Sequence, residues 1–303
     1  MSKFISTVAP EDQAFEHQQE LNKTLRKEKI AKVIRYAVLI ATGLVMLYPL
    51  FWMFFASFKP NHEIFSSVGL WPENFSLDGF INGWQTGTEY TFGRFILNTF
   101  WYVLPKVVLT VISSVVVAYG FARFDFPWKK FWFAALIATI LLPQSVLLIP
   151  QYLMFREMGM LDSYMPLYIP MAFATQGFFV FMLIQFLRGI PTDMEEAAMI
   201  DGCNSFQLLL YIIVPILKPA IISVALFQFM WSVNDFLGPL IYVSSVENYP
   251  IALALKLSID VTEGAQWNEI LAMATISIIP SIVVFLFAQK YFVEGLTAGG
   301  VKG

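Results

Sequence analysis

The chain has 303 residues, of which 57% are hydrophobic and only 14% are charged, and its net charge is −3. A soluble globular chain is about half apolar and about one quarter charged, so this composition excludes an ordinary soluble domain and indicates an integral membrane protein surrounded by lipid. The single cysteine, Cys203, excludes a disulfide within the chain, and with only two histidines no metal site is expected. No nucleic-acid partner is expected either.

The first 32 residues are polar and charged, and they lack the early apolar core of a cleavable signal peptide. We expect residues 1–32 to form a solvated, partly helical, basic tail. Six apolar runs follow, each close to the roughly 20 residues that cross a bilayer as a helix. The predicted spans are residues 33–56, 95–120, 131–150, 164–187, 220–243 and 269–289. The predicted fold is therefore all-α, with six transmembrane helices in a membrane domain over 33–289 and a second tail over 290–303.

Prolines occur at or inside several of these runs. They are Pro143, Pro166, Pro170 and Pro280. Proline removes a backbone donor and kinks a helix, which lipid tolerates only where neighbouring helices or water satisfy the freed groups. The prolines therefore indicate either a packed bundle around a pathway or ordinary structural kinks.

The positions of lysine and arginine predict the orientation in the membrane. With the N-terminus inside, most of the 19 basic residues fall in cytoplasmic segments, and only Lys59, Arg94, Arg156 and Lys256 fall in outer ones. Cytoplasmic loops carry an excess of basic residues, so both termini are predicted to be cytoplasmic. The segment 188–219 is then cytoplasmic, and the long segments 57–94 and 244–268 lie outside.

The cytoplasmic segment contains a short charged helix, predicted over 193–201. Thr192 and Glu195 have the spacing of a capping box, and Gly202 is suited to a left-handed stop. Met194, Ala197, Ala198 and Asp201 fall on one face by helical spacing, where the alanines would permit close approach of a partner. The alternative is that the carboxylates only cap and solubilise a loop helix.

The flanking residues favour the interpretation that the helix over 193–201 docks against a partner protein. The stretch in question runs Glu195-Glu196-Ala197-Ala198-Met199-Ile200-Asp201-Gly202, with Pro215 and Pro219 downstream. It resembles the EAA loop of ATP-binding-cassette (ABC) importer permeases. Other stretches resemble the carbohydrate branch of that family, of the maltose-transporter G-subunit type: Ala118-Tyr119-Gly120-Phe121-Ala122-Arg123, Trp231-Ser232-Val233-Asn234-Asp235-Phe236 and the tail Gln289–Gly303. The resemblance covers nearly the whole chain from about residue 33 onward.

The resemblance implies a type I importer fold in the cytoplasmic (inner) membrane and a division of labour among several chains. This subunit would pair with a second, F-like permease, with a dimer of cytoplasmic ABC ATPase and with an extracytoplasmic solute-binding protein that delivers a carbohydrate. The outer segment 244–268 would insert toward that binding protein. The residues implied in coupling to the ATPase are Glu195, Glu196, Ala197, Ala198, Asp201 and Gly202. The tail Gly295–Gly303 is a further candidate contact.

The chain itself is expected to be a non-catalytic subunit without a cofactor. It contains no G-x-x-x-x-G-K-[ST] loop for nucleotide phosphates, so ATP and Mg²⁺ are expected on the partner ATPase. No paired intramembrane aspartates, H-E-x-x-H motif or Cys-His or Ser-His arrangement indicates an intramembrane enzyme. The sequence does not identify the sugar.

Polar and aromatic groups within or near the apolar runs are candidates for a substrate pathway or gate. They are Asn98, Gln144, Gln228, Trp231, Asn234 and Asp235. Such groups are costly in lipid and usually face a pathway or a partner, and amides beside aromatic rings suit a hydroxyl-rich sugar. The alternative is that they form hydrogen bonds between helices.

A second transport mechanism is also compatible with the sequence. Lys106 and Asp235 are charged residues that could serve as partners in an ion-coupled secondary carrier. Against this, six spans without a visible inverted repeat make an incomplete carrier.

Overall fold

The computed structural model describes residues 10–67, 69–86, 89–259 and 265–298. Within these ranges every element is a helix, and no strand occurs. The chain divides into two compact units, Met1–Phe55 and Ala56–Gly303.

The first unit consists of the helix α1, Pro10–Ala56. Its part from Thr24 to Ala56 is long and apolar enough to cross a membrane, and none of its most apolar window is buried within the protein. The predicted boundary at residue 33 is therefore not a structural one, because the described part of the tail continues into the span without a break. Residues 1–9 of the predicted tail lie outside the described residues.

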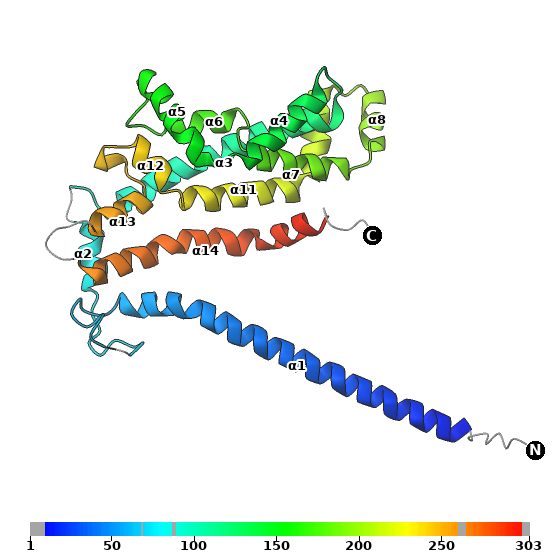
Figure 1. Ribbon diagram of the computed structural model, residues 1–303, viewed down its shortest axis with the longest axis horizontal. Helices are drawn as coiled ribbons and strands as arrows, with labels where there is room; N and C mark the ends of the chain where they lie inside the picture. Colours follow the sequence, from blue (N-terminus) through cyan, green and yellow to red (C-terminus); the bar gives the residue numbers. More distant parts are fainter. Residues whose placement is uncertain (1–9, 68, 87–88, 260–264, 299–303) are drawn as a thin grey trace, which may run out of the picture. The chain divides into compact units, whose positions relative to one another are not determined.

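The second unit is built around α3, Phe92–Arg123. This helix packs against α7 (Gly177–Arg188), α11 (Lys218–Val233) and α6 (Met165–Ala172). On its other side α11 packs against α14, Trp267–Ala298 (Figure 1). The long helices α3, α11 and α14 thus form the frame on which the remaining segments are held.

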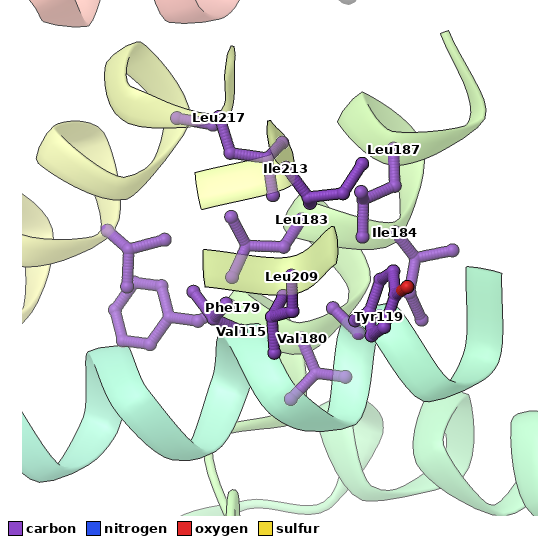
Figure 2. Close-up of a cluster of buried hydrophobic side chains, with 13 residues drawn as sticks. Val115, Tyr119, Phe179, Val180, Leu183, Ile184, Leu187, Leu209, Ile213 and Leu217 are labelled. Atoms are coloured by element: carbon purple, nitrogen blue, oxygen red, sulfur yellow. The ribbon is translucent and has the colours of Figure 1, made fainter. Parts of the chain in front are cut away.

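A cluster of aliphatic and aromatic side chains joins α3 and α7 to the segment that precedes α11. Phe179, Leu183 and Leu187 of α7 are completely buried in it (Figure 2). The segment on the opposite side contains α9 (Ser205–Leu208) and a five-residue π-helix, Leu209–Ile213, followed by α10 (Val214–Ile216). Burying a large apolar side chain stabilises a soluble fold by about 1.5–3 kcal/mol, but within lipid close packing supplies much of the attraction.

The third predicted span, residues 131–150, is not one straight helix. The structure has α4 (Lys129–Leu141) and α5 (Gln144–Glu157), which are bent by 100° relative to each other. The break lies before Pro143, whose ring disfavours helical backbone at the preceding residue. Leu142 is accordingly extended, with φ −77° and ψ 125°.

The fourth predicted span corresponds to Met165–Arg188, which is long and apolar enough to cross a membrane, and the fifth predicted span is divided. The fourth consists of α6 and α7, and the residues between them include Ala174 with a positive φ of 54°. The fifth ends at Val233 rather than at residue 243, and a bend of 79° separates α11 from the segment Ser205–Ile216. Beyond α11 come α12 (Leu237–Tyr242), the 3₁₀ turn Val246–Asn248 and α13 (Ile251–Ile259). In the described chain, four helices are long and apolar enough to cross a membrane, or up to six if each bent pair forms one span.

The short helix α2, Asp78–Gln85, packs closely against α14 through two glycines. A Cβ atom added to Gly79 would lie 2.6 Å from the backbone oxygen of Asn268, and one added to Gly83 would lie 3.1 Å from that of Glu269. Small residues spaced four apart allow this kind of close helix approach.

Replacing Gly79 with Ala is therefore expected to destabilise the protein by about 1–3 kcal/mol, because the backbone of α14 must move. The measurement is the thermal unfolding midpoint of the detergent-solubilised protein. Gly120→Ala is the matched control, because a Cβ atom there meets nothing within 4 Å. Equal midpoints for Gly79→Ala and wild type would contradict the close packing.

Candidate functional site

The charged helix predicted from the sequence is α8, Asp193–Ile200. It follows α7 and lies at the opposite end of the second unit from α2 and α13 (Figure 1). The predicted stop is confirmed, since Gly202 has a φ of +89°. The amide of Cys203 donates to the Ala198 carbonyl at 3.0 Å, and that of Gly202 donates to the Met199 carbonyl at 3.1 Å, as in a Schellman motif.

The predicted capping box at Thr192 is wrong. Thr192 has helical backbone angles, φ −76° and ψ −18°, and its side chain makes no capping hydrogen bond. The Glu195 side chain is engaged elsewhere, as described below. The capping box of this region opens α9 instead, where Asn204 Oδ1 accepts from the amide of Gln207 at 2.9 Å and Gln207 Oε1 accepts from the amide of Asn204 at 2.9 Å.

Glu195 forms an ion pair with Arg123, the last residue of α3. Arg123 Nε lies 2.5 Å from Glu195 Oε1, and the two side chains are only 11% and 7% exposed. The same guanidinium donates through Nη2 to the carbonyl oxygen of Ile190 at 3.1 Å. In the sequence, Arg123 stands out only as part of the stretch Ala118–Arg123, which resembles the family, and as one of the basic residues of the predicted cytoplasmic segments. The pairing was missed because 72 residues separate the two side chains, and only the packing of α3 against α7 brings them together.

The two sides of α8 differ sharply in exposure. Glu195 and Ala198 are its buried residues. The prediction that Ala198 shares one face with Met194 and Ala197 is therefore wrong, because those two residues are exposed. The exposed residues are Asp193, Met194, Glu196, Ala197, Met199 and Ile200, and Asp201 and Gly202 beyond the helix are exposed as well. We call this group the outer surface of α8. It combines carboxylates with exposed apolar side chains, Met194 at 54% and Ile200 at 87% exposure.

Two of the candidate pathway residues are buried and hold the fold together. Asn98 Nδ2 donates to the carbonyl oxygens of Glu247 at 2.7 Å and Tyr249 at 3.0 Å, which fixes the 3₁₀ turn Val246–Asn248 to α3. Gln228 is 1% exposed and donates to Ser232 Oγ at 2.9 Å within α11. The Asn98 bonds agree with the alternative of hydrogen bonding between helices, whereas the Gln228 bond lies within one helix.

Three other candidates lie on the surface of the chain. Gln144 is exposed at the break between α4 and α5, and Trp231 and Asn234 are exposed at the end of α11. The Trp231 ring packs against Phe179 with 4.9 Å between ring centroids and against Phe178 at 5.8 Å. The result is an exposed aromatic surface next to an amide, a combination that suits a sugar ring.

Asp235, the last candidate, belongs to a partly buried ion pair. Lys106 Nζ of α3 lies 3.0 Å from Asp235 Oδ2, and the side chains are 9% and 25% exposed. Tyr102 Oη donates to the same carboxylate oxygen at 2.5 Å, and the amide of Gly238 donates to Asp235 Oδ1 at 3.0 Å. The two charges proposed for a carrier thus meet, and they join α3 to the turn that follows α11.

The start of the segment 244–268, which is predicted to lie outside the membrane, is anchored by a carboxylate. Asp162 accepts hydrogen bonds from the hydroxyl of Ser245 at 2.5 Å and from the amides of Ser245 and Ser244 at 2.8 and 3.0 Å. These bonds, that from the Ser245 hydroxyl first, hold the pKa of Asp162 below its ordinary value. Residues 260–264 of this segment lie outside the described residues.

Comparison with known proteins places this arrangement in a family. Residues 114–297 match the family of binding-protein-dependent transport system inner membrane components, which is more than half of the chain. The chain belongs to this family. Proteins of this kind are transport components of the inner membrane that work with an ATPase and a solute-binding protein.

Individual relatives agree over nearly their whole length. The chain is 31% identical to the arabinooligosaccharides transport system permease protein AraQ of Bacillus subtilis, over 86% of this chain and 92% of the relative. It is 30% identical to the diacetylchitobiose uptake system permease protein DasC of Streptomyces coelicolor, over 88% and 95%. The sn-glycerol-3-phosphate transport system permease protein UgpE of Agrobacterium fabrum is 26% identical, over 90% and 98%.

A solved structure shares the fold. It is a chain of a bacterial ABC transporter involved in the import of the acidic polysaccharide alginate, with a TM-score of 0.77, 23% sequence identity, and coverage of 88% of this chain and 98% of that chain. The predicted all-helical importer fold is confirmed. The alternative of an ion-coupled carrier receives no support from these relatives.

Proposed function

We propose that this chain is a permease subunit of an ATP-driven carbohydrate importer, and that it couples to its ATPase through the outer surface of α8. The observation that carries this proposal is the two-sided character of α8. One side is fastened to α3 through Glu195, and the other exposes Glu196 among apolar side chains. Exposed apolar patches with polar neighbours are typical of protein interfaces. Glu196, Ala197, Asp201 and Gly202 are the proposed contact residues, and Glu195 and Ala198 support them from within.

Carbohydrate is the proposed substrate class for two reasons. Relatives at about 30% identity are named as permeases for arabinooligosaccharides and diacetylchitobiose. In addition, Trp231 exposes an aromatic surface three residues before the exposed amide of Asn234, whereas Asn98 and Gln228 are buried. We therefore assign Trp231, Asn234 and Gln144 to the pathway, and we assign Asp235 to a structural ion pair beside it.

The remaining parts of the assembly follow from this proposal. A second, F-like permease supplies the other half of the pathway, a dimer of cytoplasmic ATPase binds and hydrolyses ATP with Mg²⁺, and an extracytoplasmic binding protein delivers the sugar. This chain then crosses the membrane six times, with each bent helix pair counted as one span, and both termini are cytoplasmic. The chain itself holds no cofactor.

The test is purification of the chain, tagged at its N-terminus, from its native membrane in mild detergent, followed by mass spectrometry of the co-purifying proteins. We expect a second permease and an ATPase, with two ATPase copies for each copy of this chain. Recovery of the chain alone, or only as an assembly of identical copies, would contradict the proposal.

A further inference from the structure

The helix α8 is joined to the rest of the chain by short linkers that contain glycine. Residues 189–192, which include Gly189 and Pro191, precede it, and Gly202 follows it with a left-handed backbone conformation. Only two of its side chains, Glu195 and Ala198, are buried. A helix held in this way would pivot on its linkers when pushed by a partner, unless another contact fixed it to the bundle.

The Arg123–Glu195 ion pair is such a contact. Arg123 binds the Glu195 carboxylate in the first turn of α8 and also binds the carbonyl of Ile190 in the preceding linker. The planar guanidinium holds its donors in a rigid fork, so one side chain fixes both the helix and the linker. Because both side chains are largely buried, the attraction is screened less than that of a surface pair.

Arg123 also terminates the central helix of the second unit. The same helix, α3, carries Lys106 about 25 Å away, at 1.5 Å for each residue, and Lys106 forms an ion pair with Asp235 after α11. The helix α3 therefore has an ion pair to α8 at one end and a second ion pair, near its middle, to the turn that follows Trp231 and Asn234. A rigid helix fixed at two points transmits a displacement along its length.

We propose that the Arg123–Glu195 ion pair is the connection that passes movement of α8 to α3 and so to the pathway. Arg123 and Glu195 are positioning residues in this role, because neither has to contact the ATPase or the sugar. The inference rests on the proposed function, since it takes α8 to be the helix that receives the ATPase.

The experiment uses the complete importer, with the second permease, the ATPase and the binding protein, reconstituted in lipid vesicles. Arg123→Gln, Arg123→Lys and Glu195→Gln are each compared with wild type, and ATP hydrolysis and sugar uptake are measured on the same vesicles. We expect each Gln variant to assemble and hydrolyse ATP, while sugar taken up for each ATP falls about tenfold, within the usual range of coupling between sites. Arg123→Lys keeps the charge but loses the forked donors of the guanidinium. Its sugar uptake for each ATP is therefore expected to lie between that of wild type and that of the Gln variants.

The exposed ion pair Lys129–Asp125 is the matched control, because it lies near Arg123 in the chain and joins atoms 3.1 Å apart, with Asp125 fully exposed. The double variant Lys129→Gln/Asp125→Asn is expected to leave uptake for each ATP unchanged. A charge swap, Arg123→Glu with Glu195→Arg, is expected to recover part of the uptake lost in the single variants. Recovery should be incomplete, because a glutamate at position 123 cannot donate to the Ile190 carbonyl.

Three results would overturn the inference. These are unchanged uptake for each ATP in the Gln variants, loss of the ATPase from the complex, and a charge swap no better than the single changes. Loss of the ATPase would show that the pair serves folding or docking rather than transmission. Failure of the proposed function has a different signature, since wild-type vesicles would then show no ATP-dependent sugar uptake at all.

Discussion

Changing Glu196 to Lys is expected to lower ATP-driven sugar uptake about 100-fold, while the chain still reaches the membrane and retains part of its assembly with the ATPase. Glu196 is exposed, and its side chain makes no hydrogen bond or ion pair with the described residues, so the change leaves the fold of this chain intact. In the complex the carboxylate would be enclosed by the ATPase. Reversing a charge enclosed in an interface costs about 2–5 kcal/mol, and about 2.8 kcal/mol corresponds to 100-fold.

The measurement is uptake of labelled sugar together with ATP hydrolysis, in vesicles that contain the complete importer. Asp125→Lys is the matched control, since it makes the same change of charge at an exposed position before α4, outside the outer surface of α8. Glu196→Gln separates charge from shape and is expected to have a smaller effect. Normal uptake in Glu196→Lys would contradict the coupling role of this residue.

Changing Lys106 to Met is expected to destabilise the protein by about 3 kcal/mol, because breaking a buried pair leaves the partner charge uncompensated. The Asp235 carboxylate would then keep only its hydrogen bonds from Tyr102 and Gly238. The double variant Lys106→Met/Asp235→Asn removes both charges and is expected to recover most of the lost stability. The measurement is the free energy of unfolding by denaturant titration in mixed micelles.

The same two variants also distinguish the two transport mechanisms. In the proposed importer the pair is structural, so the stable double variant is expected to retain ATP-driven uptake. An ion-coupled carrier that used this pair would lose transport in both variants, whatever their stability. A stable double variant without any transport would therefore contradict the structural role of the pair.

The functional helix could be predicted closely from the sequence, and its orientation could not. The predicted helix 193–201 differs from Asp193–Ile200 by one residue, and Gly202 takes the expected left-handed conformation. These features depend on local backbone preferences, which the sequence displays directly. The direction in which Glu195 points is decided by Arg123, a residue of another helix, so local spacing suggested a capping box that does not form.

The candidate pathway residues divide into buried and exposed ones for a similar reason. Polar residues in apolar runs are readily found in a sequence, but whether each one is buried depends on the packing of distant segments. Asn98 meets the backbone of residues about 150 positions later, whereas Trp231 and Asn234 remain exposed. Only the packing of α3 against α11 and against the turn Val246–Asn248 separates the buried amides from the exposed ones.

Taken by itself, the sequence determined the membrane location, the helical class and the family, because these depend on composition, on the length of apolar runs and on short motifs. The tertiary structure alone decided which charges meet. Arg123 reaches Glu195, and Lys106 reaches Asp235. These features require side chains from distant parts of the chain to be brought within about 3 Å of each other, and it is the packing of the helices that brings them there.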